Sequence, residues 1–466
     1  MGFLFELFRK KPAVEVAPVA PGFRRIESVR LWHARTPQAV RVLELDGDVL
    51  WEGWTKPGQR PDERAATRYP SPTAARTAFD ELLRVAVGNF GEHERTVRDV
   101  PLSKWKAGEA PFASDPAQEA ALDSAPDDVA LARVYTDWLV GHGDARGELF
   151  ALAAERRLDE VEQYLEVNGA AMLGSLELAR GAELGSLEWN AGLLTGARLK
   201  RRLDDSPLLL AEVTRQFLAL PLSRFVTSLR FGLASYAGDN DWAETLAVVG
   251  SSSRAPFLRS LRFDDFTREE SEISWTSYGD LSVLWAPFVR LEELRIRAGG
   301  EGVLGRLEFP RLKRFARETG GLRNDELDAI LSAKWPLLEQ LEIWFGDPNY
   351  GAQVDAGRLE SFLKGGHPPK LRALGLMNCD FAGELLPLVL GSPLLPALRS
   401  LDLSMGVLGD EHVDALLAAR LGHLEVLNLE SNAFSPEACA RLKAALPLAK
   451  LGDQNPAAER YVSVGE

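Results

Sequence analysis

Glycines with the spacing of a dinucleotide fingerprint occur in the second half of this 466-residue sequence. Gly300, Gly302 and Gly305 spell GxGxxG after an apolar stretch, a pattern that holds a pyrophosphate where a long helix opens directly after it. Pro310 follows Gly305 too soon for that helix, so we expect a glycine-rich turn instead. The sequence has no GxxxxGK[ST], GxSxG or HExxH motif. It therefore predicts no cofactor.

Metal-binding and nucleophilic residues also lack a telling pattern. The two cysteines, Cys379 and Cys439, are too few for a disulfide framework and form no CxxC or Cys/His cluster. The six histidines are scattered without ligand spacing. We therefore predict no metal site, no catalytic residue and a cytoplasmic location. A catalytic site built from residues far apart in the sequence is the alternative.

Charged residues beside Trp138 suggest acid/base chemistry at first sight. They are Asp137, Asp144, Arg146 and Glu148. A structural role is the alternative: Gly143 ends a helix, and Arg146 ties the following turn to one of the carboxylates by a paired hydrogen bond. We favour the structural role.

A repeated pattern of leucine, two residues, leucine, one residue, leucine runs from residue 218 onward, with other apolar residues allowed. The copies begin at Phe225, Leu258, Leu291, Leu338, Leu371, Leu398 and Leu424, and a degenerate copy begins at Leu312, where Arg317 replaces the last apolar residue. The intervals of roughly 20 to 33 residues leave room for a helix in each repeat. One strand and one helix cannot bury their shared apolar face alone, whereas stacked repeats form one continuous core. The pattern is typical of leucine-rich repeats and predicts an α/β solenoid of the ribonuclease-inhibitor-like type.

In that repeat family, asparagine or cysteine follows the last leucine of each strand and satisfies the turning backbone. Asn432 and Cys379 occupy this place. The resemblance implies that Cys379 is a buried ladder residue and not a nucleophile. Cys439 stands on the apolar face expected for a helix over 436–446, so we predict that it is a small core residue.

A small antiparallel sheet is predicted near the N-terminus. Residues 23–33, 40–46 and 49–54 alternate apolar with polar side chains, and a helix over 72–90 follows. This order resembles the WGR domain over about residues 22–95.

Trp54 matches the tryptophan of the WGR family, and Gly58 with Gln59 matches its Gly-Gln turn. Thr55 and Lys56 stand where the family has glycine and arginine. In poly(ADP-ribose) polymerases this module takes part in DNA-end recognition, so the resemblance implies nucleic acid as an alternative partner. The missing arginine favours a structural or protein-binding role.

The run over 130–150 closely resembles the repeat-companion domain, a small bacterial module found upstream of leucine-rich repeats, and it continues weakly through 187–192. No activity is implied by it. The whole order is similar to a bacterial WGR and leucine-rich-repeat family of unassigned biochemical activity, and residues 335–351 carry that likeness most specifically.

The predicted organisation has five parts. They are an N-terminal amphipathic segment and tether (1–21), a WGR-like α+β domain (22–98), a linker (99–126), a repeat-companion helical domain (127–204), and a leucine-rich-repeat domain with a C-terminal cap (205–466). Residues 1–11 place phenylalanine and leucine before a basic trio, which suits weak docking on a membrane or a partner. A disordered start is the alternative, and no apolar run reaches the roughly 20 residues of a membrane span.

The predicted binding surface is the strand face of the repeats. Side chains alternate along a strand, so the residues between the leucines point to the concave face. They form a column of Arg230, Arg262, Arg295, Glu342, Gly375, Asp402 and Asn428, with the weak repeat omitted. Trp344 and Met377 flank this column side by side and resemble an exposed interface anchor.

We therefore predict a non-enzymatic scaffold on which a protein or peptide partner docks, its acidic end toward the arginines. The predicted contacts are Arg295, Arg297, Glu342, Trp344 and Met377, with Asp402 toward the acidic end. An insertion over 346–357 that covers Trp344 is the alternative to an exposed anchor. The alternative functions are a nucleic-acid-associated factor acting through the WGR-like domain and an unrecognised enzyme or regulatory subunit.

Overall fold

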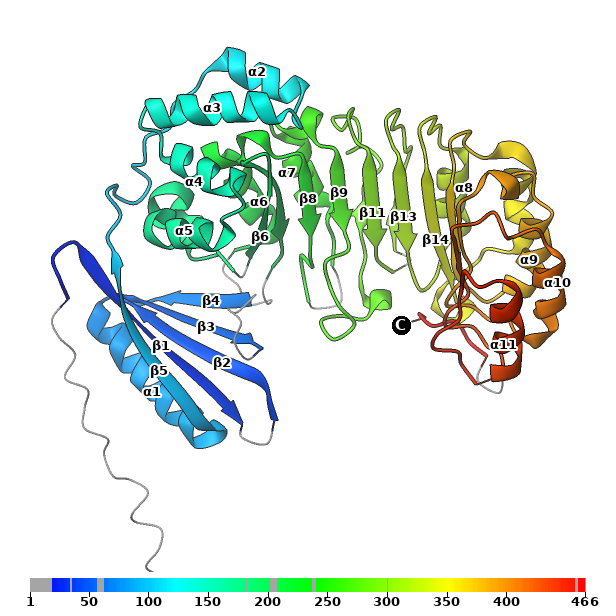
Figure 1. Cartoon of the computed structure of the whole chain (residues 1–466), viewed down its shortest axis with the longest axis horizontal. Coiled ribbons are helices and arrows are strands. Elements are labelled where there is room, and N and C mark those ends of the chain that lie inside the picture. The colour runs from blue at the N-terminus through cyan, green and yellow to red at the C-terminus, as the bar shows by residue number, and fades with distance from the viewer. Residues whose placement is uncertain are drawn as a thin grey trace, which may run out of the picture. The chain divides into compact units, whose positions relative to one another are not determined.

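The computed structural model describes residues 19–33, 36–56, 63–181, 183–201, 208–236, 240–299, 301–456 and 460–465 (Figure 1). The chain divides into two compact units. One comprises Met1–Ala110 with Glu162–Gly181, and the other comprises Pro111–Val161 with Ala182–Glu466. The amphipathic segment over 1–11 and the Gly58-Gln59 turn lie outside the described residues.

The first unit contains a five-stranded antiparallel sheet in the order β4-β3-β2-β1-β5. Its elements are β1 (Phe23–His33), β2 (Thr36–Asp46), β3 (Val49–Thr55), β4 (Glu63–Arg68), α1 (Pro72–Phe90) and β5 (Gly91–Pro101). Helix α1 buries Phe79 against Val29, Leu31 and Leu43 on one face of the sheet. The three predicted strands and the helix are confirmed.

Strand β5 was not predicted, because charged residues fill most of its length and leave little apolar alternation. It pairs with β1 along its whole length. The expected linker over 99–126 therefore begins inside a strand. Within the same expected linker, α2 (Pro116–Ser124) forms with Asp115 as its N-cap. Residues Glu162–Gly181 also belong to this first unit, where Glu166 pairs with Arg98 at 2.5 Å.

Helices α3 (Val129–Gly141), α4 (Ala145–Ala154) and the start of α5 (Leu158–Leu173) precede the large sheet of the second unit. Gly143 follows α3 with a positive φ of 69°. Arg146 donates two hydrogen bonds to Asp144, at 3.0 Å from Nε and 2.8 Å from Nη2. Both side chains are buried. The structural role predicted for this turn is confirmed.

The second unit is built on a mixed sheet of eleven strands (Figure 1). In spatial order the strands are β6 (Leu184–Asn190), β7 (Leu193–Leu199), β8 (Ser228–Phe231), β9 (Ser260–Phe263), β11 (Glu293–Arg297), β13 (Arg314–Glu318), β14 (Gln340–Gly346), β15 (Ala373–Cys379), β16 (Ser400–Asp402), β17 (Val426–Asn428) and β18 (Ala449–Lys450). Each of the eight predicted repeats supplies one strand, and neighbouring repeats pair in parallel. The short strands β10 (Gly279–Asp280) and β12 (Gly302–Val303) form a separate pair.

The sheet begins earlier than expected, with an antiparallel hairpin of β6 and β7. Ala191 and Gly192 turn this hairpin with φ values of 51° and 88°. Positive φ at both residues matches a type I′ turn, whose twist suits paired strands. The expectation of a helical domain over 127–204 is therefore wrong at its end, where Ala191 and Gly192 close a β-hairpin.

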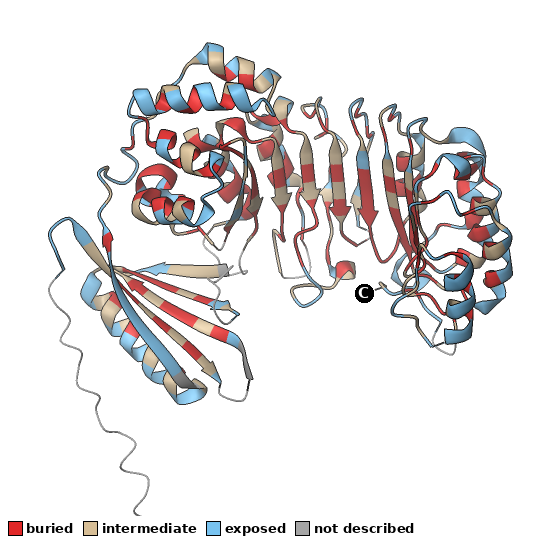
Figure 2. Ribbon diagram, viewed as in Figure 1, coloured by how far each residue is buried: buried red, intermediate tan, exposed pale blue. Residues whose placement is uncertain are grey.

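Helices connect the parallel strands and bury one face each. They are α6 (Leu210–Ala219), α7 (Ala243–Ser251), α8 (Asn324–Ser332), α9 (Ala382–Leu390), α10 (Val413–Ala418) and α11 (Pro436–Ala445). Leu261 and Leu294 are completely buried and pair in register, and the neighbouring repeats continue this ladder. Buried and half-exposed residues alternate along β8, β9 and β11 (Figure 2).

The polar residues after the strands behave as the repeat pattern predicts. The Asn432 side chain is completely buried, accepts a hydrogen bond from Leu408 N–H at 3.0 Å and donates one to Leu403 O at 2.9 Å. Cys379 is also buried, and burial raises the pKa of its thiol. Cys439 is only half-buried because Ala438 faces the core in its place, so the expectation that it is a core residue is wrong.

Within the described ranges, no helix combines the length and apolar content that a membrane span requires.

Candidate functional site

One residue of each strand of this sheet from β7 to β18 belongs to a continuous column, and all of them except Ala316 and Lys450 stand between two buried apolar positions. In register the column reads Arg198, Arg230, Arg262, Arg295, Ala316, Glu342, Gly375, Asp402, Asn428 and Lys450. The predicted members are confirmed as neighbours. Arg198 was missed, although Leu194, Ala197 and Leu199 repeat the leucine spacing with one alanine. We call these ten residues the polar column.

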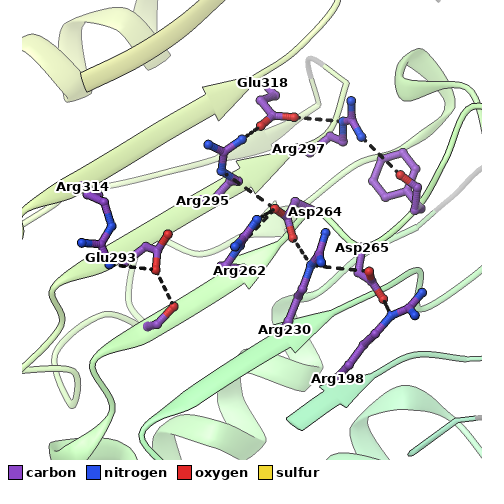
Figure 3. Close-up of polar contacts among 12 residues, drawn as sticks. Arg198, Arg230, Arg262, Asp264, Asp265, Glu293, Arg295, Arg297, Arg314 and Glu318 are labelled. Atoms are coloured by element: carbon purple, nitrogen blue, oxygen red, sulfur yellow. Dashed lines mark hydrogen bonds and ion pairs between the residues drawn. The ribbon is translucent and has the colours of Figure 1, made fainter. Parts of the chain in front are cut away.

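Two aspartates that directly follow β9 hold the first arginines of the column (Figure 3). Asp264 lies 2.8 Å from Arg230 Nε and 2.6 Å from Arg262 Nη2. Asp265 pairs with Arg198 and lies 3.4 Å from Arg230. Neighbouring strands are about 4.8 Å apart, so these guanidinium groups would repel one another without the carboxylates between them.

Glu318 does the same at the end of β13, the degenerate repeat. Its carboxylate pairs with Arg295 and lies 3.0 Å from Arg297 Nε (Figure 3). Arg295 also reaches Glu342 at 3.0 Å. Burial raises the pKa of the Glu318 carboxyl, and this effect outweighs the attraction of the two arginines. The sequence prediction did not include Glu318, because the predicted column omitted the degenerate repeat to which Glu318 belongs.

Arginine and carboxylate side chains differ in depth here. The side chains of Arg198, Arg230, Arg262, Arg295 and Arg297 are between 25% and 37% exposed. Those of Asp264, Asp265 and Glu318 are between 4% and 6% exposed. The carboxylates therefore form a buried lower layer, and solvent meets a layer of guanidinium groups, which we call the cationic layer.

Trp344 and Met377 do pair in register, as predicted, but they are not exposed. Trp344 is 7% exposed and Met377 is 9% exposed. The guanidinium of Arg297 lies 5.6 Å from the centre of the Trp344 ring. The prediction of an exposed aromatic anchor is therefore wrong. The buried Trp344 Nε1 has no hydrogen-bond partner among the described residues.

Two segments lie at the strand ends beside these residues. Tyr350 belongs to the insertion over 346–357, the segment that the alternative prediction places over Trp344. The Tyr350 ring contacts Gly465. Val464 is hydrogen-bonded to Asn378, the residue after Met377. The contact between Val464 and Asn378 spans 86 residues. No periodic pattern could have revealed it.

Asp402 is not part of the arginine group. Its carboxylate accepts hydrogen bonds from Asn428 Nδ2 at 2.9 Å and from the Ser404 hydroxyl at 2.6 Å. Gly375 separates it from Glu342 in the column. Of the six predicted contact residues, the structure thus groups Arg295, Arg297 and Glu342, buries Trp344 with Met377, and leaves Asp402 apart.

The other motifs have structural explanations. The stretch from Glu301 to Lys313 contains strand β12 and no helix, as predicted for a glycine-rich turn. Among the described residues, no group of three or more His, Cys, Asp or Glu side chains could hold a metal ion.

The arginines of the first unit are mostly paired within that unit. Nine of its described arginines lie within 4 Å of a carboxylate: Arg24, Arg25, Arg41, Arg64, Arg68, Arg76, Arg95, Arg98 and Arg180. Trp54, the residue that resembles the WGR tryptophan, is 51% exposed and lies 5.7 Å from the Phe90 ring. The nucleic-acid alternative stays a prediction, because an arginine in an ion pair keeps donors that can contact a second anion.

No family model matches this chain, and no curated protein matches it. The crystal structure of a Bacteroides fragilis protein, a structural-genomics target, covers 94% of this chain and 100% of its own with 18% identity and a TM-score of 0.51. At that identity the similarity concerns the fold alone. A leucine-rich-repeat protein from Leptospira interrogans covers 55% of this chain and 89% of its own at 12% identity, but a TM-score of 0.15 carries no argument.

Proposed function

We propose that the second unit is a leucine-rich-repeat interaction domain and that the chain is a cytoplasmic, non-enzymatic scaffold that binds another protein. Eight repeats that each supply one strand to the same parallel sheet support the first part. Such sheets present a rigid surface on which side chains stand at regular spacing. The resemblance to a bacterial WGR and leucine-rich-repeat family belongs to the same proposal.

We further propose that the partner contributes an acidic segment. The observation that carries this is the difference in depth: guanidinium groups face solvent while Asp264, Asp265 and Glu318 are buried beneath them. A partner's carboxylates would meet donors that are already oriented by these ion pairs, so little side-chain entropy is lost on binding. Arginine is also enriched among the residues that dominate binding energy at interfaces.

Affinity capture with the full chain tests this proposal. The wild type should retain its partner at low salt and lose it as salt rises, because the charged contacts are half-exposed and screened. Arg262→Gln should weaken capture, since the ion-pair partner of the Arg262 side chain within the described part of the chain is Asp264 and its loss changes the surface more than the core. Arg358→Gln is the matched control: this arginine is 39% exposed and pairs with Asp328, away from the column. Equal recovery with both variants would contradict the proposal.

A further inference from the structure

Residues 460–465 form neither helix nor strand and lie across the carboxyl ends of the parallel strands, where the C label stands in Figure 1. Ser463 N–H donates to Met405 O, at 3.1 Å, in the loop after β16. Val464 N–H donates to Asn378 Oδ1 at 2.9 Å, and Asn378 Nδ2 donates to Val464 O. The segment thus crosses from β16 toward β13 held by main-chain hydrogen bonds.

Asn378 is placed to bind a peptide backbone. Its side chain is completely buried at the end of β15, and its amide carries one acceptor and one donor that match the N–H and C=O of a single residue. A contact of this kind does not depend on the side chain of the bound residue. It recognises the main chain, and main-chain hydrogen bonds also supply affinity for peptides in other folds.

Two positions of the segment do select side chains. Val462 is only 5% exposed, so an apolar residue is required there. At Gly465 a Cβ atom would collide with the Tyr350 ring, and a Cβ atom at Gly320 would collide with the main chain of Gly465. The surface therefore fits an apolar residue followed three positions later by glycine.

The groove continues past Gly465. A cavity of about 380 Å³ adjoins residues 461–465 and reaches the loop after β9 and the end of β11. Its other lining residues include Phe266, Arg268, Ile273, Arg297 and Asp347. Arg297 also covers the Trp344 ring, whose buried N–H lacks a partner among the described residues. Ligands of parallel α/β sheets commonly bind at the carboxyl ends of the strands, and this cavity is at that edge.

We propose that the groove formed by Gly320, Tyr350, Asn378, Met405 and this cavity is a peptide-binding site. Residues 460–465 occupy part of it in cis, and a partner segment with an apolar residue three positions before a glycine replaces them. This site recognises main chain at the strand ends, and it shares Arg297 with the cationic layer. A tethered segment has an effective concentration in the millimolar range, so a free peptide competes poorly until the tethered one is weakened.

The test uses the full chain and a fluorescent peptide with the sequence of residues 460–465, RYVSVG, followed by polarisation. Val464→Pro removes the N–H that Asn378 accepts and should release the tethered segment. This variant should bind the peptide about tenfold more tightly than the wild type. Val464→Ala keeps the N–H and is the matched control, with wild-type affinity. Val462→Asp releases the segment by a different route and should behave like Val464→Pro.

Recognition by the groove is tested in the Val464→Pro background. Asn378→Asp keeps an acceptor but loses the amide donor, so peptide affinity should fall about tenfold. A peptide with alanine at the glycine position should bind equally weakly. The proposal is overturned if neither Val464→Pro nor Val462→Asp binds the peptide, or if the wild type binds it as tightly as they do. The Arg262→Gln variant is expected to lose binding to the acidic partner. Its affinity for the peptide should nevertheless equal that of the protein without this substitution.

Discussion

Arg317 Nη2 lies 2.8 Å from Glu326 Oε1, and the two side chains are 0% and 1% exposed. Arg317 stands where the other repeats have their last apolar residue, which is why its copy of the pattern is degenerate. Its remaining donors bind the carbonyl oxygens of Ala298 and Gly299, and Tyr278 donates to the same Glu326 oxygen at 2.8 Å. The buried Arg317 charge is thus tolerated because it has a carboxylate partner and its donors have hydrogen-bond acceptors.

Glu326→Gln should lower the free energy of unfolding of the second unit by about 3–5 kcal/mol, because it leaves the Arg317 charge buried and uncompensated. The double variant Arg317→Met/Glu326→Gln should cost less than the sum of the two single changes, since the partners are coupled. Urea unfolding followed by tryptophan fluorescence measures both. Asp328→Asn removes a carboxylate of the exposed pair with Arg358 and should cost under about 1 kcal/mol. If Glu326→Gln lowered the free energy of unfolding as little as Asp328→Asn does, the buried Arg317–Glu326 pair would not have the stabilising role argued for it.

Much of the fold follows from local patterns. The leucine spacing placed the eight repeat strands, and alternation along each strand placed Arg230, Arg262 and Arg295 in one column. Both features depend on periodicity, which the sequence displays directly. Even Arg317, which breaks the pattern, kept its strand because the neighbouring strands provide the pairing.

The candidate site was only partly predictable, because its decisive contacts join distant parts of the chain. Trp344 has the position of a surface residue in its repeat, yet it is buried. Asn378 meets Val464 across 86 residues. Likewise, the Asp264 side chain is more deeply buried than the arginines it contacts, and its position depends on the turn after β9. The repeat pattern does not extend into that turn.

Trp344→Ala should lower the free energy of unfolding of the second unit by about 3–5 kcal/mol, the range for removing a large buried aromatic side chain. An exposed anchor would instead affect binding with little effect on stability. Trp275→Ala is the control, because Trp275 is 60% exposed. Urea denaturation compares the two, and an unchanged midpoint for Trp344→Ala would show that Trp344 is accessible in solution.

Asp264→Asn should destabilise the second unit by about 1–3 kcal/mol, because Arg230 and Arg262 lose the negative charge and one of the two oxygen acceptors that they share. The neighbouring guanidinium groups then repel one another, and added salt screens this repulsion. The deficit relative to wild type should therefore shrink as sodium chloride rises from about 0.05 to 0.5 M. Unfolding midpoints at several salt concentrations measure it. A deficit that grows with salt would show that repulsion is not its source.

Glu411 should contribute to stability only when it is ionised. Its carboxylate faces Arg460 in two contacts of 2.6 and 2.7 Å, and the hydrogen bond with Arg460 lowers the pKa of Glu411 from 4.5 to about 2. A carboxyl whose pKa is lower in the folded state stabilises the fold above its unfolded pKa, and this stability is lost as the pH falls through the folded value. Glu411 is 53% exposed, so solvent screening limits the effect to under about 1 kcal/mol.

The stability difference between wild type and Glu411→Gln should accordingly be constant from pH 7 to about 5 and decrease as the pH falls from 4.5 toward 2. Hydrogen exchange of residues 460–465 is the more direct measurement, because Arg460 begins the segment that Asn378 holds. In Glu411→Gln these amides should exchange faster at pH 6 than in the wild type, while amides of strand β11 should not change. Arg441→Gln, which loses a more exposed pair with Asp414, should leave residues 460–465 unaffected. Faster exchange in both variants would mean that the pair with Glu411 has no special part in holding the segment in its groove.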